Sequence, residues 1–152
     1  DPREAEMVAQ LASGSVGEAM NMDMEFVRRA RPAIINRIAD TVTDENPDPE
    51  KIMGIADQLA RLGDNSLHMI RTLLADVASN KLRRNIANSD LEDAIDKLSR
   101  RWSLERVLSH FERTLRAEAG LARNLNRAFM YENLMLALTR GREYENHSGN
   151  TV

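Results

Sequence analysis

The residues in this chain best suited to metal or acid–base chemistry are its three histidines. His68, His110 and His147 lie far apart in the sequence, and none has a second ligand at helical spacing. A zinc site needs about three or four convergent ligands. We therefore predict surface or packed histidines and no metal site.

A second candidate for chemistry is a group of carboxylates within residues 44–50, namely Asp44, Glu45, Asp48 and Glu50. Paired carboxylates act as acid and base only where burial or a neighbouring charge moves one pKa. Because the segment is polar and contains two prolines, it is expected to be a solvated loop that caps helices.

Phosphate-binding and nucleophile motifs are lacking. The Gly14–Gly17 turn is the glycine-rich piece, but no lysine follows it and no strand precedes it. The chain has no Gly-x-Ser-x-Gly elbow and no cysteine. We predict no catalytic residues, no cofactor site, no small-molecule substrate and no ATP binding.

Basic residues form three short clusters without interleaved aromatics, apart from Trp102. Nucleic-acid binding usually needs a contiguous basic face, and the net charge is −3. No apolar run approaches the roughly 18–20 residues of a membrane span. Direct nucleic-acid binding and membrane association are therefore not expected. The clusters are Arg28, Arg29 and Arg31; Lys81, Arg83 and Arg84; and Arg100 and Arg101.

The composition predicts a helical fold around these residues. The chain has 152 residues, 42% of them hydrophobic, and only seven glycines and four prolines. Apolar residues recur at helical spacing, and strand-like alternation is absent. We predict an all-α bundle of about five or six main helices with a short helical N-terminal remnant.

Several boundaries can be predicted from capping residues. Asp48 and Pro49 should begin a helix that Gly63 ends. Ser89 to Glu92 reads as a capping box, and Asn126 should cap the last helix. Pro32 should kink or break the helix near Arg31, because proline lacks the amide donor.

The final stretch, from Ser103 to Leu138, should form the two helices that the others enclose. In the first, Leu104, Val107, Leu108, Phe111 and Leu115 recur at helical spacing. We expect Leu108, Phe111, Leu115 and Leu134 to be mutually buried. An exposed patch on the last helix would instead mark a partner surface, and its candidate residues are Met130, Tyr131, Met135 and Leu138.

This stretch also carries a family resemblance. Its order is Asn88–Leu91, a link at Leu98–Glu105, a long helix, then Leu121–Arg127 and Glu132–Leu136. That order resembles the C-terminal domain of the bacterial DNA polymerase III delta-prime subunit, part of the sliding-clamp loader. The Leu11–Ala19 segment resembles the turn that ends the lid of clamp-loader AAA+ modules.

The resemblance implies a collar domain at residues 23–140, through which the subunits of the clamp loader associate. Residues 1–22 would be a remnant of the AAA+ lid domain, and residues 141–152 a flexible tail of an excised fragment. The implied partners are the gamma/tau and delta subunits, in the cytoplasm, within a holoenzyme that has DNA polymerase activity. ATP-binding relatives carry a lid arginine where Gly17 and Glu18 stand here, which agrees with a subunit that is not an ATPase.

Two other classes of function compete with this one. An independent helical adaptor or regulatory bundle would have the same pattern of stripes. A small-molecule enzyme has little support, because no acid–base pair or ligand set converges in the sequence.

Overall fold

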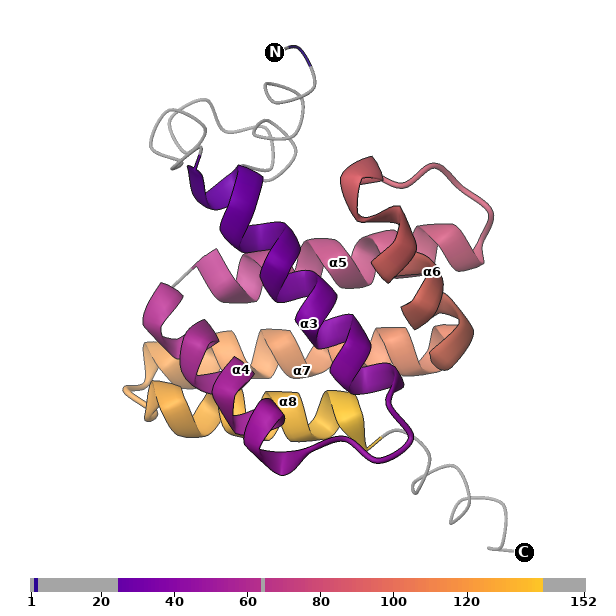
Figure 1. Cartoon of the computed structure of the whole chain (residues 1–152). Coiled ribbons are helices and arrows are strands. Elements are labelled where there is room, and N and C mark those ends of the chain that lie inside the picture. The colour runs from indigo at the N-terminus through magenta and orange to yellow at the C-terminus, as the bar shows by residue number, and fades with distance from the viewer. Residues whose placement is uncertain (1, 3–24, 64, 141–152) are drawn as a thin grey trace, which may run out of the picture.

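The computed structural model of the chain describes residues 25–63 and 65–140, together with Pro2, and every regular element within these ranges is a helix (Figure 1). This confirms the expected all-α bundle. The predictions for the lid remnant, apart from Pro2, and for the tail after Arg140 lie outside the described residues. The α-helices are α3 (Arg31–Thr43), α4 (Pro49–Leu62), α5 (Asn65–Lys81), α6 (Glu92–Arg101), α7 (Leu104–Ala122) and α8 (Arg127–Thr139).

Helix α4 begins and ends where its capping residues predict. The Asp48 carboxylate accepts a hydrogen bond from the backbone N–H of Glu50 at 2.9 Å, and Pro49 occupies the first helical position. Gly63 follows the last turn with a φ of 76°, a conformation that costs glycine little. The charged loop before α4 therefore serves to start the helix.

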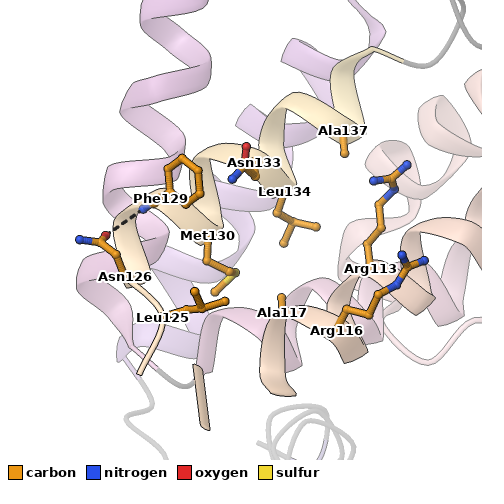
Figure 2. Close-up of a pocket in the computed structure, with 10 residues that line it drawn as sticks. All are labelled: Arg113, Arg116, Ala117, Leu125, Asn126, Phe129, Met130, Asn133, Leu134 and Ala137. Atoms are coloured by element: carbon orange, nitrogen blue, oxygen red, sulfur yellow. Dashed lines mark hydrogen bonds between the residues drawn. The ribbon is translucent and has the colours of Figure 1, made fainter. Parts of the chain in front are cut away.

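Helix α8 is capped as expected by Asn126, whose side-chain oxygen accepts from the backbone N–H of Phe129 at 3.0 Å (Figure 2). Asn124, in the turn before it, has a φ of 62°. Asparagine tolerates this left-handed conformation better than most residues. Together the two asparagines close the turn between α7 and α8.

The disturbance expected at Pro32 takes the form of a change in helix type. A π-helical turn, η1 (Phe26–Ala30), runs directly into α3, and the backbone N–H of Arg31 donates to the carbonyl of Phe26. A wider turn at this point accommodates a residue that has no N–H and crowds the preceding turn. The helix is therefore not broken near Arg31.

The predicted capping box at Ser89 to Glu92 is wrong. Residues Ser89–Leu91 form a 3₁₀ turn, η2, and neither it nor α6 has a side-chain capping bond. The N–H of Leu91 donates to the carbonyl of Asn88 at 3.0 Å, so the tight turn itself satisfies this group. Asp90 pairs with Arg31 on α3 at 2.6 Å.

A buried carboxylate holds the segment before η2 against α5. Asp76 is 3% exposed and accepts from the backbone N–H groups of Ala87 and Asn88, at 2.7 and 3.0 Å. It also accepts from the Asn88 side-chain amide at 2.6 Å. The amide oxygen of Asn88 accepts in turn from Arg31 at 3.3 Å. One polar network thus links α3, α5 and the start of α6.

The core is continuous through the bundle. Helix α4 packs on α8, α5 packs on α6 and α7, and α3 packs on α4, α6 and α8 (Figure 1). Trp102, at the end of α6, is 2% exposed within this core. The central buried side chains are Ile34, Ile35, Ile38, Ile55, Leu59, Ile70, Leu74, Ile95, Leu98, Tyr131 and Met135.

The expected orientation of α7 is wrong for two of its leucines. Leu108 and Leu115 are 57% and 48% exposed, and Phe111 is only partly buried, whereas Leu134 is buried as expected. The helix instead buries Val107, His110, Thr114 and Gly120. The four residues expected to form one cluster are therefore divided between the surface and the core.

Polar contacts with α5 hold α7 in this orientation. The Nε of Arg71 donates to the Thr114 hydroxyl at 3.2 Å, and its Nη2 pairs with the Glu118 carboxylate at 2.7 Å. Both α7 partners lie on the side that faces α5. With that side fixed, the leucines roughly a quarter-turn away cannot also face the core.

Candidate subunit-association surface

The two described histidines lie on different helices. His68 lies on α5 and His110 on α7, while His147 lies outside the described residues. Within residues 25–63 and 65–140, no group of three or more His, Asp or Glu side chains is arranged to hold a metal ion.

His110 is held neutral in a packed position. It is 1% exposed, and its ring lies 4.7 Å from the Trp102 ring, centroid to centroid, at an interplanar angle of 59°. Burial, reinforced by the positive charges of Arg106 and Arg113, lowers its pKa from 6.5 to about 3. An imidazole that stays unprotonated and is closed off from solvent is a packing group and not an acid or base at neutral pH.

The carboxylates of residues 44–50 have local structural partners. The Asp44 side chain accepts from the backbone N–H of Asn46 at 3.0 Å, and Asp48 caps α4. Asp44, Glu45, Asp48 and Glu50 are all exposed. The arrangement is that of a solvated turn and helix cap, as the sequence indicated.

The basic clusters are partly used inside the molecule. Arg31 is 1% exposed and paired with Asp90, and the Lys81 ammonium donates to the backbone carbonyl of Ser99 at 2.8 Å. Arg29 lies next to Glu25 at 3.7 Å. Two of the three clusters thus each have a member committed to packing between helices. No helix in the described part of the chain is long and apolar enough to cross a membrane.

The four α8 residues expected at a subunit interface are covered by the chain's own helices. Met130, Tyr131, Met135 and Leu138 are 7%, 0%, 0% and 2% exposed. The Tyr131 hydroxyl donates to the carbonyl of Gly63 at 3.3 Å, which joins α8 to the end of α4. Packing on α4 therefore already accounts for their apolar character, and their contact with another subunit stays a prediction.

Helix α7 has an apolar side that is partly exposed. Leu104, Leu108, Phe111 and Leu115 follow one another at intervals of four, three and four residues, which puts them on one side of the helix. Leu108 and Leu115 are about half exposed, and Leu104 and Phe111 are partly covered. We call these four residues the α7 stripe.

The α7 stripe is more hydrophobic than the face that α7 buries. Val107, His110 and Thr114, with Ala117 and Leu121 partly covered, form the inward side at intervals of three and four residues. A helix in an isolated globular protein normally buries its most apolar side. Exposed contiguous apolar surface typically marks a site of association.

The comparisons with known proteins identify one family. Residues 30–140 match the model described as DNA polymerase III, delta subunit, C terminal. The matched family model is that of the delta subunit, whereas the resemblance found in the sequence was to delta-prime. No curated protein and no solved structure matched in the other two comparisons.

Proposed function

Since the chain belongs to the family of C-terminal domains of DNA polymerase III delta subunits, which act in the clamp loader of DNA replication, we propose that it is a collar domain that joins its subunit to others. The domain would extend over residues 23–140. Its role is structural, and it neither hydrolyses nor binds ATP.

The orientation of α7 is the observation that carries this proposal. The helix exposes Leu108 and Leu115, with Leu104 and Phe111 partly covered beside them. The side that it buries is less apolar and consists of Val107, His110, Thr114 and Gly120. Apolar area removed from water contributes roughly 25 cal/mol per Å². A neighbouring protein of the loader that covered the α7 stripe would recover this contribution, which the isolated domain lacks.

The α8 residues have a supporting role in this arrangement. Met130 is 7% exposed and lines a groove between α7 and α8 that lies away from the α7 stripe. Tyr131, Met135 and Leu138 are buried where α8 packs on its neighbours, chiefly α4, and so fix the position of α8. We propose that they stabilise the interface without contacting the partner.

The proposed partners are clamp-loader subunits, gamma/tau first. A replacement experiment can tell whether this chain corresponds to delta or to delta-prime, since it should take the place of the subunit to which it corresponds. Added to a reconstituted loader, the chain should assemble when delta is omitted if the family description applies. It should assemble when delta-prime is omitted if the sequence resemblance applies.

The proposal is tested by binding of the chain to purified gamma/tau, measured by size-exclusion chromatography and interferometry. Leu108→Glu combined with Leu115→Glu should weaken binding by about tenfold or more, because a carboxylate would be buried against apolar surface. Both positions are half exposed, so the variant should keep its fold.

Leu82→Glu is the matched control, since Leu82 is 51% exposed but lies just after the end of α5, outside the α7 stripe. It should bind as the unmodified chain does. Equal binding by all three proteins would remove the α7 stripe from the interface. No binding by any of them, with every protein of the clamp loader tried, would favour the alternative of an independent helical adaptor.

A further inference from the structure

A groove of about 260 Å³ runs between α7 and α8 on the other side of α7 from the stripe. Arg113 on its wall and Leu115 in the stripe are two positions apart, or roughly 200° around the helix. Figure 2 shows the groove between the two helices, with Leu125 and Asn126 of the turn that joins them at one end. It is therefore a separate surface from the one proposed for association with other subunits.

The groove has an apolar floor and an exposed apolar end. Leu134 and Met130 line it from α8, at 4% and 7% exposure. At the end near the turn, Phe129 and Leu125 are 61% and 56% exposed (Figure 2). Phe129 is the most exposed large hydrophobic side chain in the described residues. Such a side chain, placed beside a hollow, is suited to pack on an inserted group.

The charged side chains that line the groove are all positive. Arg113 and Arg116 project from α7, and no Asp or Glu is among the residues that line the groove. Arg116 lies 3.5 Å from Glu112, but both side chains are more than 70% exposed, and such pairs contribute little. Arg113 has no ion-pair partner within the described part of the chain. Both guanidinium groups are thus available to a carboxylate.

We propose that this groove binds a peptide segment of a partner protein in which one or two large apolar side chains are flanked by Asp or Glu. The apolar side chains would lie on Met130 and Leu134 beside Phe129, and the carboxylates would pair with Arg113 and Arg116. The exposed side-chain amide of Asn133, on the groove wall, can bond to the peptide backbone.

The size of the groove favours a peptide over a compact small molecule. Pockets for drug-sized ligands occupy about 300–1,000 Å³ and cover most of the ligand. This groove is smaller and open to solvent, which suits a few side chains of a longer segment that extends beyond it. The arginines favour an acidic segment over a basic one by charge complementarity.

The test measures fluorescence anisotropy of a short labelled peptide, with a Leu-Phe pair flanked by Asp on both sides, added to the full chain. It should bind saturably and more weakly as salt is raised, because salt screens exposed charge pairs. Replacing Asp by Lys, or Leu-Phe by Ala-Ala, should each weaken binding about tenfold or more.

Variants then locate the bound peptide. Arg113→Glu with Arg116→Glu, and separately Phe129→Ala, should each weaken binding about tenfold. Arg100→Glu on the exposed part of α6 and Leu82→Ala are matched controls that should bind within about twofold. All these positions are exposed, so folding should be unaffected.

Three results would overturn the proposal. The Lys-flanked peptide could bind as well as the Asp-flanked one, or the groove variants could bind like their controls. The third is that the arginine variant binds peptide normally but loses gamma/tau, which would assign the groove to the interface with that subunit. If only the Leu108→Glu and Leu115→Glu substitutions abolish gamma/tau binding, that result concerns the collar proposal and not the peptide groove.

Discussion

Asp76→Ala should be among the most destabilising substitutions outside the apolar core. The carboxylate is 3% exposed and accepts three hydrogen bonds from the segment before η2. Alanine leaves all three donors without their partner. It also frees the side chain of Asn88, whose own amide oxygen accepts a hydrogen bond from Arg31.

The magnitude follows from which donors water can reach. Ala87 is exposed, so its N–H can bond to water after the substitution. Asn88 is 3% exposed, so its backbone N–H and side-chain amide would stay buried and unsatisfied. A buried unsatisfied group costs about 1–3 kcal/mol, and two of them give a loss of about 2–6 kcal/mol in the free energy of unfolding.

Urea unfolding measured by circular dichroism and by the fluorescence of the single tryptophan gives this quantity directly. Trp102 is 2% exposed, so its emission should report the loss of the core. Asp57→Ala is the matched control, because Asp57 is 59% exposed and pairs with the exposed Arg61 one turn away. It should cost no more than about 0.5 kcal/mol. A loss below about 1 kcal/mol for Asp76→Ala would refute the network argument.

Three further predictions concern α7 and α8. The pKa of His110 is lowered to about 3, so the unfolded chain, with its ordinary value of 6.5, binds the proton first as pH falls. The free energy of unfolding should therefore decrease by about 2 kcal/mol as the pH falls from about 7 to 5. In urea titrations, His110→Leu should remove this loss, whereas the control His68→Leu should keep it. Asn126→Ala should cost about 1 kcal/mol by loss of the cap, and an unchanged unfolding midpoint would contradict it. Leu108→Ala should change the free energy of unfolding by less than about 0.5 kcal/mol, whereas Leu98→Ala should cost about 2–5 kcal/mol. Equal losses would mean that Leu108 faces the core.

Local signals in the sequence predicted much of the fold because their causes are local. Asp48 with Pro49, Gly63 and Asn126 act on backbone groups within a few positions, and all act as predicted. Helical spacing of apolar residues likewise follows from the chain's own geometry, which is why the all-α class was predictable.

The orientation of α7 and the start of α6 depend on contacts between distant residues. Helix α7 has two apolar sides, and the contacts of Arg71 with Thr114 and Glu118 decide which one is buried. Those contacts span 43 and 47 positions. The Ser89 capping motif gives way to the pairing of Asp90 with Arg31, 59 positions away. No local pattern encodes such pairings.

The burial of the four predicted α8 residues could not be read from the sequence for the same reason. An apolar stripe in a sequence does not tell whether it faces the core or a partner. In the structure Met130, Tyr131, Met135 and Leu138 pack in the core, and their contact with a partner stays a prediction. The α7 stripe is recognised by comparing the apolar character of the exposed and the buried sides of one helix. It appears only when the burial of both sides is known.

The most direct measurement of the central claim is site-specific photo-crosslinking in the assembled clamp loader. A photoreactive phenylalanine derivative at position 115 should cross-link to a neighbouring protein of the loader, because Leu115 lies in the exposed α7 stripe. The same derivative at position 82, equally exposed but outside the stripe, should give no such product. Cross-linking at 82 and not at 115, in a loader that has incorporated the chain, would contradict the account.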